Sequence, residues 1–173
     1  LKITKQYTKI KTDDKKALTI KQYLKLLKDF RPLNNNDIFN KLIHYKAFED
    51  LSLDDRIAFC TGVIKLLHPS TKTKKFKFKF DKETQHLDLS KNPWLRSILC
   101  LQNFPLNSVD LSGSGITTII GLRAQPLSDI NISNTKIISL HSLSNKRIKT
   151  LDISRNSIYN INSINNFPIE ILY

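Results

Sequence analysis

Apolar residues in the second half of the chain recur with a period of 21 positions. The shared pattern, PLxxLDISxxxIxxLxxLxxx, keeps its apolar positions through every full copy, and three copies align without gaps. An earlier copy carries one extra residue near Pro93 and Trp94, and the last residues begin a fifth copy. The copies are 85–104, 105–125, 126–146, 147–167 and 168–173.

Each copy predicts one strand and one helical return. In the LDIS-type segment the two apolar residues are two positions apart, so both point to the same face of a strand. The next apolar residues of the second copy, Ile116, Ile119 and Leu122, are three apart, which favours a tight helical or 3₁₀ return. One copy cannot bury its own apolar side, so the copies must stack. We therefore expect an α/β fold with a parallel sheet on one side and returns on the other.

The repeat resembles the leucine-rich repeat family. The family's LxxLxLxxNxIxxL core is matched by Leu87, Leu89, Asn92 and Leu95, and the resemblance covers about half the chain. Short copies that start with Pro-Leu are similar to a bacterial subclass, which is sometimes joined to serine/threonine kinase domains. The resemblance implies a leucine-rich-repeat solenoid that binds other proteins and needs no cofactor.

A column of small polar residues follows the strand position in each copy. Such side chains can turn inward and bond turn backbone that would otherwise be unpaired. The family usually has Asn here, and Ser and Thr replace it twice in this chain, so we expect a structural column. Its members are Asn92, Ser114, Thr135 and Asn156.

The first half of the chain has a helical pattern instead. Thr19 with Gln22, Asn36 or Asp37, and Ser52 with Asp55 each precede apolar residues at helical spacing, which predicts three helix starts. The third helix should end near Pro69. We expect a small, basic helical N-terminal subdomain and cap over 1–70, a capping strand and turn over 71–83, and repeats over 84–173.

The segment KKFKFKF at 74–80 alternates strictly, as a half-buried strand requires. We expect it to form a hairpin with the first repeat strand, around Asp81 and Lys82, and to close that end of the repeats. Alternatively, its lysines form a basic row that binds phosphate groups. No aromatic residue shares their face, so the row could not also stack on bases. The candidate anion-binding residues are Lys72, Lys74, Lys75, Lys77 and Lys79.

The positive charge is concentrated in the first half. Residues 1–80 hold 19 Lys and Arg against 8 Asp and Glu, a net +11 of the total +13. This asymmetry fits a nucleic acid, an anionic surface or an acidic protein as partner, and solvated helix faces would produce the same count.

The outward-facing positions of the repeat strands form the candidate partner-binding surface. Stacking should place them in files about 4.8 Å apart along a concave face. This face is either a solvated surface or a contact surface for a polar or basic protein. Calcium binding is disfavoured, because neighbouring strands offer too few converging oxygens. The candidate residues are Asp88, Ser90, Lys91, Asp110, Ser112, Asn131, Ser133, Asp152, Ser154 and Arg155, and Gly113 and Asn134 belong to the same files.

Residues of other chemical interest do not combine into a catalytic or metal-binding motif. Cys60 and Cys100 lie in apolar surroundings without a short spacing, and the four histidines form no metal-binding pair. The sequence has no phosphate-binding glycine loop and no hydrolase or kinase signature, so we expect no catalytic site, metal or cofactor. Trp94 either plugs the core at the cap junction or anchors a partner at the rim.

Our leading hypothesis is a non-catalytic protein-interaction module, with a basic nucleic-acid or anionic-surface binder second. A third hypothesis is a regulatory appendage of a larger bacterial enzyme such as a serine/threonine kinase, because the chain looks like an excised piece. We expect a cytoplasmic protein without a membrane span, since cysteine use suggests a reducing compartment. The apolar end of the repeats should be covered by further residues or by a second chain, which makes self-association there an expectation.

Overall fold

The computed structural model describes residues 51–68, 75–102, 104–123, 125–143 and 147–173. The chain divides into two compact units, Leu1–Val63 and Ile64–Tyr173. The helices predicted from Thr19 and from Asn36 or Asp37, and the candidate lysines Lys72 and Lys74, lie outside the described residues.

Helix α4 spans Leu53–Leu67 and begins where the capping pattern predicted. The Ser52 Oγ accepts a hydrogen bond from the Asp55 N–H at 3.2 Å and donates to the Asp55 carboxylate at 2.8 Å. The hydroxyl thereby satisfies one of the free amides of the first turn. The helix ends two residues before Pro69, which cannot continue the hydrogen-bond pattern.

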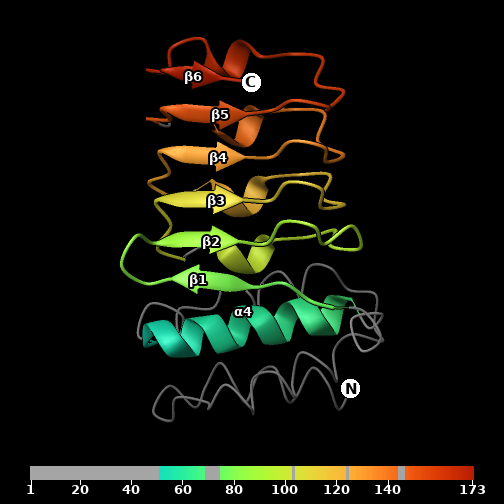
Figure 1. Cartoon of the computed structure of the whole chain (residues 1–173), viewed down its shortest axis with the longest axis vertical. Coiled ribbons are helices and arrows are strands. Elements are labelled where there is room, and N and C mark those ends of the chain that lie inside the picture. Colours follow the sequence, from blue (N-terminus) through green and yellow to red (C-terminus); the bar gives the residue numbers. More distant parts are fainter. Residues whose placement is uncertain (1–50, 69–74, 103, 124, 144–146) are drawn as a thin grey trace, which may run out of the picture. The chain divides into compact units, whose positions relative to one another are not determined.

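One six-stranded sheet organises the second unit, with its strands in chain order from β1 to β6 (Figure 1). β1 pairs with β2 in the antiparallel sense and every later pair is parallel. The predicted α/β class is therefore confirmed at the level of one mostly parallel sheet. The strands are β1 (Lys79–Asp81), β2 (His86–Asp88), β3 (Ser108–Asp110), β4 (Asp129–Asn131), β5 (Thr150–Asp152) and β6 (Ile171–Leu172).

Residues that face each other across neighbouring parallel strands are 21 positions apart in the sequence, which is the period of the repeat. Ser108 faces Asp129, Asp129 faces Thr150, and Thr150 faces Ile171. The first step, from His86 to Ser108, is 22 residues, because that copy holds the extra residue near Trp94. The periodicity of the sequence thus determines which residues are neighbours across the sheet.

A 3₁₀ helix follows each of the strands β2 to β5 and lies on one side of the sheet (Figure 1). This confirms the tight helical returns predicted from the apolar spacing. The core lies between the sheet and these helices, and it contains the apolar columns that the repeat pattern predicted, such as Leu87, Val109, Ile130 and Leu151. The helices are η4 (Leu99–Leu101), η5 (Ile120–Leu122), η6 (His141–Leu143) and η7 (Asn162–Ile164).

The capping strand is shorter than its alternating sequence predicted. Only Lys79–Asp81 pairs as strand β1, so Asp81 ends the strand rather than beginning the turn. The reason is local, because the Lys77 N–H bonds the Asn92 side chain at 3.2 Å instead of a strand backbone. The phenylalanines do face the core, where Phe80 packs edge-on against Phe104 with ring centroids 5.0 Å apart.

Candidate functional site: the polar face of the sheet

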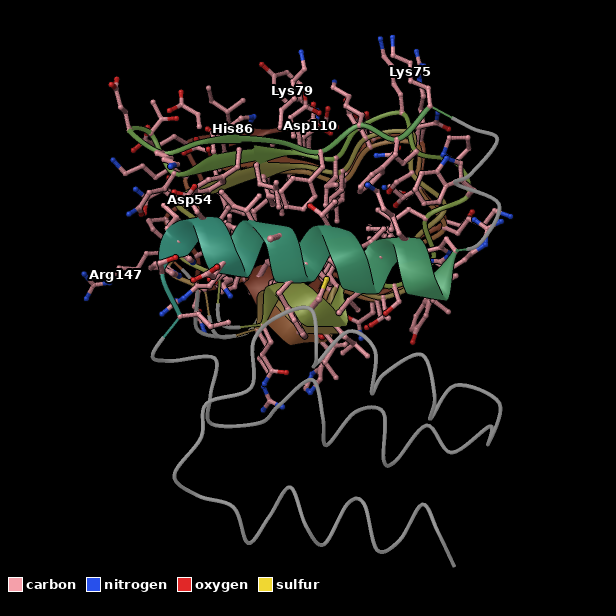
Figure 2. All side chains as sticks on the ribbon, turned by 90° about the horizontal axis from the view of Figure 1, so that it is seen from below. Asp54, Lys75, Lys79, His86, Asp110 and Arg147 are labelled. Atoms are coloured by element: carbon pink, nitrogen blue, oxygen red, sulfur yellow. The ribbon has the colours of Figure 1, made fainter. Side chains whose placement is uncertain are left out.

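Polar side chains cover the side of the sheet opposite the 3₁₀ helices, and we call this side the polar face. In β2, β3 and β5 the middle residue is buried and its two neighbours are half-buried. Figure 2 shows Lys75, Lys79, His86 and Asp110 projecting from this same side. Two rows of side chains define the face, one formed by Asp88, Asp110, Asn131 and Asp152 and the other by His86, Ser108, Asp129 and Thr150.

The predicted aspartate row has a structural role at one oxygen of each residue. The Oδ1 of each member accepts the backbone N–H of the serine two positions later, at 2.8–3.0 Å. This bond fixes the turn at the end of each strand. Asn131 does the same with an amide oxygen, so the turn requires the acceptor and not the negative charge.

The second oxygen of each aspartate distinguishes Asp88 from the others. Asp88 Oδ2 lies 2.5 Å from Lys77 Nζ, which also donates to Ser90 Oγ at 2.7 Å. Oδ2 of Asp110 and of Asp152 accepts no hydrogen bond from any described residue. The sequence placed the basic and acidic rows separately, whereas the fold joins them at Lys77 and Asp88.

Burial and hydrogen bonding act in opposite directions on the Asp88 carboxyl. Burial raises its pKa, but hydrogen bonds from Lys77 and Ser90 lower it by more, so the pKa lies below its ordinary value of 3.8. Asp88 is therefore ionised at neutral pH and held in an ion pair. Its charge is already neutralised by Lys77, so the free negative charge of this row belongs to Asp110 and Asp152.

The third predicted file consists of turn residues in the left-handed region. Lys91, Gly113, Asn134 and Arg155 have φ values of 58°, 63°, 51° and 57°. The serine file beside it is half-buried from Ser112 to Ser154, whereas Ser90 is buried and holds Lys77. The turn after each strand requires a residue with positive φ at this position. This requirement explains the file whether or not a partner binds there.

Two described lysines of the basic row are exposed, Lys75 and Lys79. Lys79 lies opposite Asp88 in the register of β1 and β2. Lys77 is half-buried and engaged with Asp88 and Ser90. The described part of the row therefore offers two unengaged ammonium groups to an anion.

The second row of the polar face was missed by sequence reasoning. His86 Nδ1 lies 2.7 Å from Ser108 Oγ, and Asp81 faces His86 in the register. The sequence did contain a signal for this row. Its members lie two residues before the aspartate row in every copy, and residues two apart on a strand point to the same face. Asp81 serves the hairpin turn, where the Thr84 and Glu83 N–H groups bond its Oδ1 and lower its pKa.

The small polar column is structural at three of its four positions. The Asn92 Nδ2 donates to the carbonyls of Lys77 and Leu89, both at 2.8 Å. The Asn156 side chain reaches back in the same manner, donating to the Ile132 carbonyl and accepting from Thr135. Ser114 differs, because its buried hydroxyl has no hydrogen-bond partner among the described residues.

Trp94 is a core residue, which resolves the two alternatives that its sequence position left open. It is buried, and its ring lies 5.4 Å from Phe76 and 5.5 Å from His68 between centroids. The backbone N–H of Arg96 donates to His68 Nε2 at 3.4 Å. The extra residue of the first copy thus places an aromatic cluster beside the capping segment.

The described residues contain no group of three or more His, Cys, Asp or Glu side chains that could hold a metal ion. Cys60 and Cys100 are buried free thiols. No helix in the described ranges is both long enough and apolar enough to cross a membrane. No family model matches the sequence, and no curated protein is significantly similar to it.

Proposed function

We propose that this chain is a leucine-rich-repeat solenoid with a non-catalytic role, and that its polar face binds another protein. Three features support the family: the 21-residue register, the 3₁₀ returns and the Asn-type column. The binding role rests on the partly exposed polar side chains of the polar face, which form continuous rows over neighbouring strands. A surface of this kind can contact an extended segment of a partner.

The observation that carries the binding proposal is the pair of unengaged Oδ2 atoms on Asp110 and Asp152. These residues lie on β3 and β5 with Asn131 between them, so strand spacing puts the two carboxylates about 10 Å apart. Their charges favour a partner with a basic segment. The proposed partner is therefore a protein that presents two or more cationic side chains to this face.

The test removes charge without disturbing the turns. Asp110→Asn with Asp152→Asn keeps the Oδ1 acceptor, as Asn131 already shows, and removes both free charges. Glu83→Gln is the control, because Glu83 is an exposed carboxylate on the hairpin turn and belongs to neither row of the polar face. Immobilised wild type and Glu83→Gln should capture the same proteins, and the double variant should lose them with at least about tenfold weaker binding. Equal capture by all three chains would contradict the proposal.

The second candidate is an anion-binding role for the basic row, supported by the exposed side chains of Lys75 and Lys79. Its test is titration of a labelled single-stranded RNA into wild type and into a Lys75→Gln, Lys79→Gln variant. If the row binds phosphates, the affinity of wild type for the RNA should decrease steeply with salt concentration, and the variant should bind the RNA more weakly than wild type at the same salt concentration. Salt-independent or absent binding removes this candidate. A regulatory appendage of a larger bacterial enzyme, such as a kinase, stays a prediction that the longer reading frame would decide.

A further inference from the structure

One row of the polar face continues from the capping strand into the strands of the repeats. Lys79 faces Asp88, and the residues that follow it in register are Asp110, Asn131 and Asp152. Each strand from β1 to β5 therefore contributes one member, and we call these five residues the charged row. Figure 2 shows Lys79 and Asp110 projecting from the same side of the sheet.

The unengaged charges of this row lie on every second strand. Lys79, on β1, is exposed and makes no ion pair with a described residue. Asp88, on β2, is already held in an ion pair. Asp110 on β3 and Asp152 on β5 use Oδ1 to accept a serine N–H, and their Oδ2 atoms accept nothing from a described residue. Across the sheet the row thus presents one positive charge followed by two negative charges.

The spacing of these charges fits a polyproline II segment that crosses the strands. Neighbouring strands are about 4.8 Å apart, so charges on every second strand are about 9.6 Å apart. Polyproline II rises about 3.1 Å per residue with three residues per turn, so every third side chain points the same way at intervals of about 9.3 Å. A β-strand places side chains on one face at intervals of about 6.6 Å or about 13 Å, which fit the row poorly.

The side chain of Asn131 favours polyproline II over an α-helix. Residues seven apart on an α-helix are separated by about 10.5 Å, so spacing alone does not decide between the two. Asn131 Oδ1 accepts the N–H and the hydroxyl of Ser133 at 3.0 and 2.7 Å, while Nδ2 donates to no described residue. Carbonyls inside an α-helix are already bonded, whereas those of polyproline II are free to accept. A free donor between two carboxylates therefore suits the open backbone of polyproline II.

We propose that the charged row binds a polyproline II segment of another protein, with one acidic and two basic side chains at intervals of three residues. The acidic side chain lies over Lys79, and the basic side chains lie over Asp110 and Asp152. This inference rests on the binding role proposed for the polar face, and it adds the conformation and the charge order of the partner. A uniformly basic segment would place a cation against Lys79, so the row discriminates against such a partner.

Titration of peptides into the isotope-labelled full chain at low salt, followed by amide NMR, tests the proposal. The matched peptides are Glu-Pro-Pro-Lys-Pro-Pro-Lys and its reverse, because polyproline II repeats every three residues in both directions. The control peptide, Glu-Pro-Lys-Pro-Lys-Pro-Pro, has the same composition but places its charges on three different sides. One matched peptide should bind at least about threefold more tightly than the control and should shift the side-chain amide signals of Asn131.

Variants of the chain assign the binding to the charged row. Lys79→Gln should weaken binding of the matched peptide about two- to fivefold, because it removes one exposed ion pair. Lys136→Gln is the control, since it removes an exposed lysine that lies outside the row, and it should leave the affinity unchanged. The Asp110→Asn, Asp152→Asn variant should weaken binding by a larger factor than Lys79→Gln, because two pairs are lost. Equal weakening by Lys79→Gln and Lys136→Gln would contradict the charge order.

The outcomes distinguish this inference from the binding role of the polar face. The decisive comparison adds an alanine-based helical peptide with its charges at intervals of seven. If that peptide or the control peptide binds as tightly as the matched peptide, and the double aspartate variant loses this binding, the polyproline II inference is wrong and the binding role stands. If no peptide shows binding that depends on Asp110 and Asp152, both are wrong.

Discussion

Asn92 and Ser114 occupy the same position in adjacent copies, yet only Asn92 satisfies its buried polar atoms. The Asn92 side chain bonds the backbone of Leu89 and of Lys77 and so joins the capping segment to the first copy. The shorter Ser114 side chain leaves its hydroxyl unpaired among the described residues. A buried polar group without a partner costs stability, so the two positions should respond oppositely to alanine.

We expect Asn92→Ala to lower the free energy of unfolding by about 2–4 kcal/mol. The substitution leaves the carbonyls of Lys77 and Leu89 and the N–H of Lys77 without the hydrogen bonds that the Asn92 side chain makes. Ser114→Ala should leave that free energy unchanged or raise it by up to about 1 kcal/mol. Urea unfolding followed by circular dichroism measures both. A Ser114→Ala variant as unstable as Asn92→Ala would mean that the Ser114 hydroxyl is bonded in solution.

The ion pair of Asp88 and Lys77 predicts a dependence of stability on pH. The folded state lowers the pKa of Asp88 below 3.8, so the unfolded chain takes up this proton first as the pH falls. The contribution is therefore complete above the unfolded pKa and is lost as the pH falls through the folded one. Asp88→Asn should reduce stability by about 1 kcal/mol at neutral pH.

The difference between wild type and Asp88→Asn should shrink as the pH falls through the lowered pKa of Asp88 and disappear below that pKa, where both side chains are neutral. Urea midpoints measured from neutral pH downward provide the comparison. Because Asn keeps the acceptor for the Ser90 N–H, the variant isolates the charge. A difference that stays constant down to the lowest pH would show that the ion pair contributes nothing.

At the scale of elements, the strand turn and the 3₁₀ return impose different demands on glycine. Gly113 has φ of +63°, and the atoms nearest to an added Cβ are 3.9 Å away, so the constraint there is conformational. Gly121 lies in η5, where an added Cβ would come within 2.1 Å of the Ile98 carbonyl oxygen. The constraint at Gly121 is the close stacking of η5 on the preceding return.

We expect Gly113→Ala to cost about 1 kcal/mol, since three other copies place non-glycine residues in the same conformation. Gly121→Ala should cost about 2–3 kcal/mol, because backbone must move to admit the methyl group. Thermal and urea unfolding of the two variants give the comparison. If the two variants lost the same free energy of unfolding, η5 could move away from the preceding return at little cost.

At the scale of the whole molecule, charge is distributed unevenly along the chain. Residues 1–80 carry a net +11, whereas residues 81–173 carry +2. Within the second unit, Lys77 neutralises Asp88 beside the capping strand, and free carboxylates begin at Asp110. The free negative charge of the aspartate row therefore lies on the strands after β2, away from the lysines of the capping segment.

The repeat period made the fold of the second half predictable. Stacked copies can bury their apolar columns in one register, and that register must equal the period. The strands, the 3₁₀ returns and the parallel pairing followed from this constraint, whereas the inward phenylalanines followed from the alternation of residues 74–80. The length of β1 did not, because the Asn92 side chain competes for the backbone of Lys77.

The sequence by itself determined which residues share a face, since alternation along a strand and a constant period suffice for that. Only the tertiary structure decided what each polar side chain does. Lys77 precedes the repeats and Asp88 lies 11 positions later in the first copy, and they pair because β1 folds back antiparallel on β2. The hydrogen bonds that the serine amides donate to the aspartates likewise form beside left-handed turn residues, which the apolar pattern does not encode. The period of the sequence therefore determines which side chains line up in a row on the sheet. Which of them form hydrogen bonds or ion pairs depends on distances that exist only after folding.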